Sequence, residues 1–376
     1  MKAKVLVTGG AGFIGSFIVD ELVRRGHTVR ILDDLEPQVH GPEGSAPEYL
    51  NPDAEFINAD VRDSDAVRRA LDGVEIVFHE AALVGVGQSM YQIRRYTDIN
   101  AIGAASVLDV IATGKNSVRK MLVASSMSIY GEGKYECSNC GAVYPKLRSL
   151  DQLRGGRWEM PCPHCNQTAR PVPTDEDKPL LPTSIYAVNK RDHEEMFLAV
   201  GNAYKIPTVA LRYFNVYGSR QALSNPYTGV CAIFSARLLN GKSPVIFEDG
   251  LQSRDFVHVR DIVQANMLAM EKPEADYQVF NVGSGRALTI LDIARILTSK
   301  IAPDSGLEPE IANKFREGDI RHCYADISRI RRSLGYEPSV AFEDGIDELT
   351  RWVSTQAAED KFEQARKELE ERGLTT

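Results

Sequence analysis

Short apolar runs alternate with amphipathic stretches through the first half of the chain. Runs of strand length lie at residues 4–8, 28–32, 55–59, 76–79 and 121–126, and segments with helical spacing separate them. Strands that alternate with helices predict parallel pairing, because a parallel connection needs a crossover. The pattern therefore predicts an α/β fold built on a doubly wound parallel sheet.

The second half of the chain follows a looser pattern. A strand is predicted at residues 207–212, and shorter strands are predicted further on at 245–247, 254–259 and 280–283. The last segment alternates charges at helical spacing, as in Glu363 with Lys367, which predicts a helix in solvent. We therefore expect a main domain at 1–134 and 173–220 with later returning segments, an insertion at 135–172, a smaller lobe mainly at 221–356, and a charged C-terminal helix at 357–376.

A glycine-rich turn joins the first predicted strand to the first helix. Its sequence is Thr8-Gly9-Gly10-Ala11-Gly12-Phe13-Ile14-Gly15, and Asp33 ends the next strand about 20 residues further on. Small residues let the backbone approach a pyrophosphate at a helix N-terminus, where N–H groups and the helix dipole favour an anion. A carboxylate at Asp33 suits a ribose and repels a 2′-phosphate, so NAD is preferred over NADP. A turn kept for packing alone would not need this acid. The predicted Rossmann-type NAD contacts are Gly9, Gly12, Phe13, Ile14, Gly15 and Asp33.

Residues that follow the next predicted strands lie at the same edge of the sheet, where ligands bind in open α/β folds. Asp60 either contacts the adenine or caps the following helix. The small side chains after the fourth strand would let the backbone lie against a cofactor, and Asn100 is expected to hold the serine-bearing strand. The predicted cofactor site therefore also includes Asp60, Val61, Ala81, Ala82, Asn100 and Ser125.

Tyr186 and Lys190 are four residues apart, so they share one face of a helix. An ammonium beside a phenol favours the phenolate and lowers the pKa of the tyrosine, which suits a general base. Such pairs also meet by chance on solvated helices. Here the strand end Ser125-Ser126-Met127-Ser128 arrives at the predicted ligand-binding edge, so we expect Ser126, Tyr186 and Lys190 to be catalytic.

Four of the six cysteines form two C-x-x-C pairs, Cys137 with Cys140 and Cys162 with Cys165. The spacing is close to that of a zinc ribbon, in which two knuckles complete a tetrahedral thiolate site. Four thiolates leave no open position, so the predicted Zn²⁺ is structural. A redox role is the alternative. Cys231 and Cys323 have no partners in the sequence and are interpreted as buried thiols.

Composition narrows the possible functions. Apolar residues make up 43% and charged residues 26% of the chain, as in ordinary globular proteins. The net charge of −8 argues against a role on nucleic acid or a membrane surface. No apolar run approaches bilayer length, and the first residues lack a signal-peptide pattern, so we expect a cytoplasmic protein.

These motifs together resemble the nucleotide-sugar epimerase and dehydratase branch of the extended short-chain dehydrogenase/reductase family. The resemblance runs from Lys4 to about Trp352, interrupted by the cysteine-rich insertion, and also rests on the segments 212–218 and 254–259. It implies bound NAD, a substrate-binding C-terminal lobe, a nucleoside-diphosphate-sugar substrate and a homodimer. It also implies that Ser126 works with Tyr186, that Lys190 binds the nicotinamide ribose, and that the sugar nucleotide contacts Ser126, Ser128, Asn215, Arg254 and Arg316.

The reaction is indicated by the residues after Ser126. Dehydratases of this branch carry Asp-Glu where this chain has Met127-Ser128, and the related decarboxylases carry a glutamate at the position of Ser128. The resemblance therefore implies 4-epimerisation, in which Tyr186 takes the C4 hydroxyl proton and a 4-keto sugar forms transiently. The insertion is similar to that of dTDP-L-rhamnose 4-epimerases, so dTDP-L-rhamnose or a UDP-hexose is expected. The alternatives are a nucleotide-sugar dehydrogenase or 4-ketoreductase, and a non-catalytic NAD-binding regulator.

Overall fold

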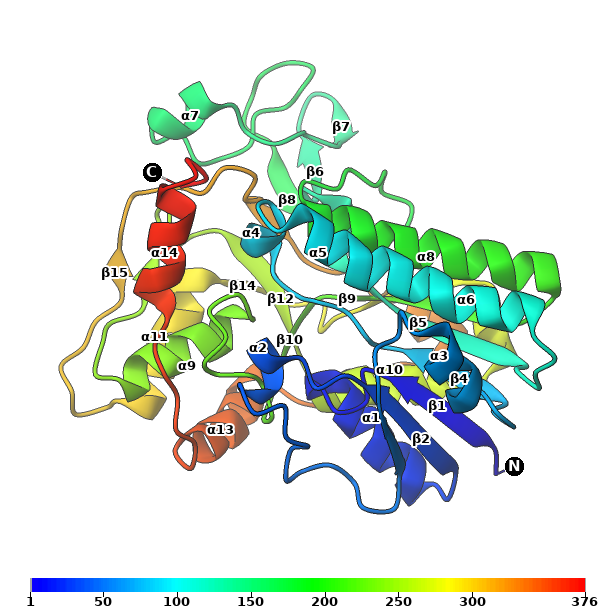
Figure 1. Cartoon of the computed structure of the whole chain (residues 1–376). Helices are drawn as coiled ribbons and strands as arrows, with labels where there is room; N and C mark the ends of the chain where they lie inside the picture. Colours follow the sequence, from blue (N-terminus) through cyan, green and yellow to red (C-terminus); the bar gives the residue numbers. More distant parts are fainter. Residues whose placement is uncertain (1, 376) are drawn as a thin grey trace.

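A seven-stranded parallel sheet forms the centre of the molecule in the computed structural model, which describes residues 2–375 (Figure 1). Its strand order is β13-β9-β5-β4-β1-β2-β3, so the chain starts in the middle and winds outward in both directions. This order confirms the predicted doubly wound sheet. The strands are β1 (Lys4–Thr8), β2 (Thr28–Asp33), β3 (Glu55–Asn58), β4 (Ile76–His79), β5 (Lys120–Ser126), β9 (Thr208–Tyr213) and β13 (Val279–Val282).

Helices cover both faces of this sheet, because β5 and its neighbours are apolar on both sides. One core joins the sheet to α1 (Phe13–Arg24), α10 (Val259–Glu271) and α12 (Ser328–Leu334). A second core joins the opposite face to α3 (Ser64–Ala70), α6 (Gly103–Thr113) and α8 (Ile185–Tyr204). Between β4 and α6 the chain forms α4 (Val86–Ser89), α5 (Ile93–Thr97) and a π-helical turn at Asp98–Ile102.

A smaller lobe follows β9. Its sheet contains β10 (Asn215–Tyr217), β12 (Ser253–His258), β14 (Ala287–Thr289) and β16 (His322–Cys323). Its helices are α9 (Val230–Leu239), α11 (Ile290–Ile301) and α13 (Phe342–Val353), which share one apolar core. The short strands β11 (Val245–Ile246) and β15 (Glu310–Ile311) pair beside it.

The cysteine-rich insertion folds as a small module at one end of the molecule (Figure 1). Its strands β6 (Lys134–Cys137), β7 (Gly141–Val143) and β8 (Arg170–Val172) form an antiparallel sheet, and α7 (Leu150–Arg154) lies in the loop between the cysteine pairs. The module has its own core, made by Tyr135, Cys137, Val143, Met160, Cys162 and Ala169.

The C-terminal helix α14 (Phe362–Glu370) differs from the expectation of a solvated helix. The side chains of Phe362, Ala365 and Leu369 are buried, because they recur at helical spacing and form an apolar stripe between the charged residues. The charged residues of α14 do pair at helical spacing: Arg366 lies 3.5 Å from Glu370, while Glu363 pairs with Arg366 and Lys367 with Glu371. Across the described residues 2–375, no helix has both the length and the apolar character needed to cross a membrane.

Candidate active site

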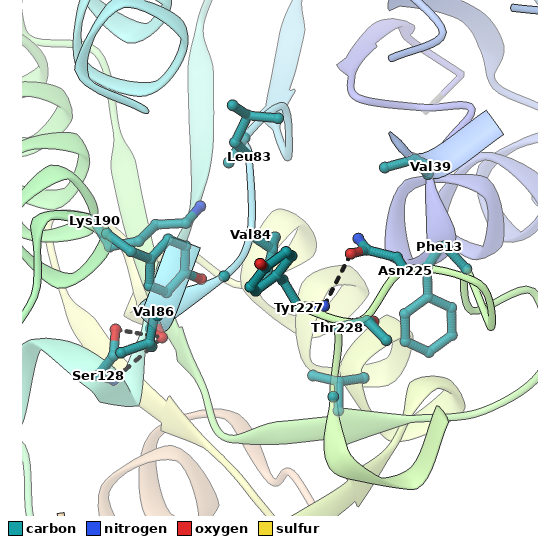
Figure 2. Close-up of a pocket in the computed structure, with 18 of the residues that line it drawn as sticks. Phe13, Val39, Leu83, Val84, Val86, Ser128, Lys190, Asn225, Tyr227 and Thr228 are labelled. Atoms are coloured by element: carbon teal, nitrogen blue, oxygen red, sulfur yellow. Dashed lines mark hydrogen bonds between the residues drawn. The ribbon is translucent and has the colours of Figure 1, made fainter. Parts of the chain in front are cut away.

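A cavity of about 510 Å³ opens along the carboxyl ends of the parallel strands. This is where ligands bind in open α/β sheets, because the strand order reverses between β1 and β4. Figure 2 shows Lys190 and Ser128 on one side of it and Phe13 on the other, with Tyr227 between them. The cavity therefore joins the predicted catalytic residues to the predicted cofactor turn.

The glycine turn between β1 and α1 leaves no room for a side chain at Gly9 or Gly15. A Cβ on Gly15 would lie 2.2 Å from the carbonyl oxygen of Gly9, and one on Gly9 would lie 2.6 Å from the amide nitrogen of Ala81. Gly9 also has a φ of +71°, a conformation that glycine adopts without strain. The turn thus presents bare backbone and the N-terminus of α1 to the cavity, as a pyrophosphate requires. The predicted contacts Gly9, Gly12, Phe13, Ile14 and Gly15 all line the cavity.

Asp33 ends β2 at the wall of the cavity. Its Oδ2 accepts a hydrogen bond of 3.0 Å from the Ala11 amide, and its Oδ1 accepts one of 2.9 Å from the Leu35 amide. Asp33 therefore also holds the glycine turn in place. The neighbouring Asp34 lines the cavity too, and partial burial together with the charge of Asp33 raises the pKa of Asp34 to about 6. These residues and the bare turn fit the adenosine half of NAD.

The other predicted cofactor residues divide into two groups. Val61, Ala81, Ala82 and Ser125 line the cavity, whereas Asp60 and Asn100 lie outside its lining. Asp60 pairs with Arg62. The side chain of Asn100 accepts a hydrogen bond of 2.8 Å from the Leu83 amide and donates one of 3.1 Å to the Leu83 carbonyl. Asn100 therefore holds the loop after β4, not the serine-bearing strand.

The cavity brings Ser126, Tyr186 and Lys190 together. Ser126 ends β5, while Tyr186 and Lys190 lie in the first turns of α8, whose N-cap is Ser184. Lys190 Nζ donates a hydrogen bond of 2.9 Å to the carbonyl oxygen of Ala124, which ties the helix to the strand end. Ser126 Oγ accepts a hydrogen bond of 3.0 Å from Ser128 Oγ. The predicted general base, its hydroxyl partner and its cation thus converge from two elements.

Burial dominates the electrostatics of these groups. Burial raises the pKa of Tyr186 to about 12, and a hydrogen bond with Ser126 acts in the opposite direction. The prediction that Lys190 lowers the pKa of Tyr186 below its usual range is therefore wrong for this structure. Burial also lowers the pKa of Lys190, although the nearby carboxylate of Glu80 acts in the opposite direction. The cause is desolvation, which disfavours the charged form of both groups and which sequence spacing does not report.

Two of the predicted substrate residues lie in the cavity with unpaired polar atoms. Asn215 Oδ1 and Arg316 Nε are buried and have no hydrogen-bond partner among the described residues. The Arg316 guanidinium lies 4.2 Å from the centre of the Phe247 ring. Ser128 also lines the cavity. Buried polar atoms normally have a hydrogen-bond partner, so a polar ligand in the cavity could supply the partner of each of these two atoms.

Arg254 does not reach the cavity lining. Its guanidinium donates hydrogen bonds of 2.7–2.9 Å to the carbonyl oxygens of Ser253, Ile320 and Arg321. The hydrogen-bond donors of Arg254 are thus taken up by backbone carbonyls of neighbouring segments. The sequence alone does not reveal that these carbonyls lie within reach. In this structure Arg254 supports the segment that follows Arg316.

Some lining residues were not predicted. Glu80 lines the cavity and accepts a hydrogen bond of 3.0 Å from Tyr213 Oη; it directly precedes Ala81, so the strand-end argument could have included it. Tyr227 lines the cavity as well. Both Tyr227 and Tyr91, which lies outside the lining, donate to Glu368 of α14, at 2.9 and 2.7 Å. The apolar spacing of α14 was the available sign that this helix packs inward. Its cavity-lining residues are Phe362, Ala365, Arg366 and Leu369.

The four predicted metal ligands meet within the insertion. The Sγ atoms of Cys137, Cys140, Cys162 and Cys165 all lie within 4.8 Å of one another. The amide of His164 donates to Cys162 Sγ at 3.5 Å, while its ring is not part of the cluster. Such a set of sulfur atoms suits a tetrahedral ion. Cys231 and Cys323 are buried free thiols, as predicted.

Comparisons with known proteins agree with this geometry. The model of the "NAD dependent epimerase/dehydratase family" matches residues 5–147 and 164–283. The chain is 36% identical to a dTDP-L-rhamnose 4-epimerase of Burkholderia thailandensis, over 93% of this chain and 95% of the relative. A UDP-glucose 4-epimerase of Thermotoga maritima, solved with UDP-glucose, has a TM-score of 0.75 and 32% identity over 93% of this chain and 98% of that one. One from Thermus thermophilus, solved with NAD, has a TM-score of 0.73 and 27% identity over 94% of this chain and 100% of that one. The chain belongs to the NAD dependent epimerase/dehydratase family.

Proposed function

We propose that the protein is a nucleoside-diphosphate-sugar 4-epimerase that inverts C4 through a transient 4-keto sugar and retains its NAD. The observation that carries the proposal is that Ser126, Tyr186 and Lys190 share one cavity with the glycine turn. The epimerase names of the similar proteins support the same reaction class. The dTDP-L-rhamnose 4-epimerase relative makes dTDP-L-rhamnose the first substrate to test, followed by UDP-hexoses.

The residues of the cavity have distinct roles in this reaction. When bound, NAD supplies the acceptor and donor of the C4 hydride. Tyr186 Oη takes the proton of the C4 hydroxyl and later returns a proton. Ser126 is hydrogen-bonded to the phenol. Because burial raises the pKa of Tyr186, the phenolate needs stabilisation, and the hydrogen bond with Ser126 acts in that direction. Lys190 binds the nicotinamide ribose.

The substrate side has to hold the nucleotide while the sugar turns. Arg316 presents a planar guanidinium that suits a diphosphate, and Asn215 offers a buried amide near the sugar. With the diphosphate held at one end, the sugar can present either face of C4 to the same base.

Proton NMR of the purified protein with dTDP-L-rhamnose, UDP-glucose and UDP-galactose, without added NAD, tests this proposal. We expect conversion of at least one sugar to its C4 epimer. Turnover that occurs only when NAD(H) is supplied and consumed would instead establish a dehydrogenase or 4-ketoreductase. No turnover under either condition would favour the non-catalytic regulator.

We further propose that Cys137, Cys140, Cys162 and Cys165 bind one structural Zn²⁺, and that the protein is a homodimer. The proximity of the four sulfur atoms supports the metal, and the family resemblance supports the dimer. Elemental analysis should find about one zinc per chain, and Cys162→Ser should lower that content while NAD content stays constant. Protein with reduced thiols and no zinc would contradict the metal site. Sedimentation velocity tests the dimer.

A further inference from the structure

The insertion is connected to the smaller lobe through Arg148, which lies in the loop between the two cysteine pairs. The Arg148 side chain is 1% exposed, although it belongs to a surface module. Its two Nη atoms each donate a hydrogen bond of 2.8 Å to Glu248, and Nη2 also donates one of 3.1 Å to the carbonyl oxygen of Asp319. The partners of this side chain therefore lie mainly outside the insertion.

Glu159 makes a second connection from the same loop. Its Oε1 accepts hydrogen bonds of 3.0 and 2.6 Å from Arg321, and its Oε2 lies 3.2 Å from His322 Nε2. Arg321 is fully buried and also pairs with Glu248 and Asp249, at 2.9 and 2.7 Å. Arg148 and Arg321 thus share Glu248, and one network joins the insertion to residues 319–322.

This network adjoins the part of the cavity wall that carries Arg316. Arg316, Gly318 and Asp319 line the cavity, and Arg316 stacks on Phe247, the residue before Glu248. Arg148 therefore bonds two segments that meet at Arg316: it bonds Glu248, next to the ring on which Arg316 stacks, and the carbonyl of Asp319, in the segment of Arg316 itself.

A role in stability alone does not account for this arrangement. Buried ion pairs lose hydration, and apolar side chains of similar volume often stabilise a fold equally well. Bidentate pairing does fix orientation, because the guanidinium and the carboxylate must align. The burial and the fork geometry of Arg148 therefore favour a role in positioning.

We infer that the insertion is a positioning element of the substrate side of the cavity, in which Arg148 and Glu159 hold residues 316–322 so that Arg316 faces a nucleoside diphosphate. The inference rests on the proposed function for the identity of the ligand. The positioning itself concerns this chain alone, so it can be measured without substrate.

Arg148→Met in the NAD-containing, full-length protein tests the inference. Methionine keeps much of the volume and removes the fork. We expect amide hydrogen exchange in residues 315–322 to become at least tenfold faster, and KM for the accepted sugar nucleotide to rise at least tenfold. kcat should stay within threefold of the wild-type value, and NAD content should be unchanged. Arg148→Lys should recover only part of the effect, since lysine cannot form the bidentate pair.

Arg170→Met is the matched control. Arg170 lies in the same module and pairs with Glu136 at 2.6 Å, but its side chain is 76% exposed. It should leave both exchange and KM within twofold of wild type. An Arg148→Met protein that is folded and shows unchanged exchange and KM would overturn the inference.

Glu159→Gln provides the test if Arg148→Met does not fold. Glu159 is half-exposed, and Arg321 keeps Glu248 and Asp249 as partners in this variant. We expect faster exchange at residues 319–322, and unchanged exchange would overturn the inference. Calorimetry of the wild type with UDP and dTDP separates the two proposals: failure of both to bind contradicts the proposed function, while the exchange result still decides the positioning role.

Discussion

The two sides of the cavity are built in different ways. On the NAD side, the glycine turn and the exits of β2, β4 and β5 are contiguous motifs at the ends of neighbouring strands. On the substrate side, the wall combines residues from the segments 84–90, 221–233, 316–319 and 362–374, which are distant in sequence. Local motifs on a sheet edge position a cofactor common to a family, whereas separate loops and helices can change with the substrate.

Tyr186→Phe should give the largest effect and should act where the two sides meet. The variant removes the phenolic oxygen that accepts the C4 proton, so we expect turnover to fall about 10³-fold. NAD content and binding of UDP or dTDP should stay unchanged, because the ring remains in place. Tyr204→Phe, on the same helix at a position 54% exposed, is the control and should retain full activity. Turnover within tenfold of wild type in Tyr186→Phe would reject Tyr186 as the base.

Gly15→Ala should damage the NAD side selectively. The new methyl group would lie 2.2 Å from the Gly9 carbonyl oxygen, so the turn must move. We expect NAD retained through purification to fall at least tenfold, and overpacking to lower the free energy of unfolding by about 1–3 kcal/mol.

Gly87→Ala is the corresponding change on the substrate side. Its Cβ would meet Leu369 at an ordinary 3.5 Å, so NAD content should be unchanged. Equal loss of NAD in both variants would show that the two sides are not independent.

Ser126→Ala tests the electrostatics of the base. The hydrogen bond with Ser126 lowers the pKa of Tyr186, so its loss should raise that pKa further. Since the phenolate is the active form, the acidic limb of the kcat/KM profile should move to higher pH. Activity at pH 7 should fall roughly 10- to 100-fold, as expected for one hydrogen bond to a charged group. An unchanged limb would mean that another group controls this titration.

The contrast also explains how far the sequence predicts the structure. Gly15 and Tyr186 could be recognised because each belongs to a motif that is contiguous in sequence. The roles of Arg254 and Asn100 could not, because their partners, the carbonyls of Ile320 and Arg321 and the backbone of Leu83, are set by tertiary packing.

Desolvation is a second reason why the sequence does not predict the properties of the site. The spacing of Tyr186 and Lys190 predicts that they lie close together, but not that burial raises the pKa of the phenol and lowers the pKa of the ammonium. For α14, the sequence analysis considered only the charged residues. The apolar residues that the helix buries were also present at helical spacing in the sequence.

The contact between α14 and the cavity loops gives the smallest predicted effect and the most specific one. Glu368 accepts hydrogen bonds from Tyr91 and Tyr227, which come from two different loops of the substrate side. Glu368→Ala removes both, but the site is open to water, so we expect only about a threefold rise in KM, with kcat and NAD content unchanged. Glu371→Ala is the control, because its side chain is 60% exposed and lies 3.9 Å from Lys367. A change in NAD content with Glu368→Ala would place α14 on the cofactor side, whereas a change in KM alone would show that the chain's last helix belongs to the substrate side.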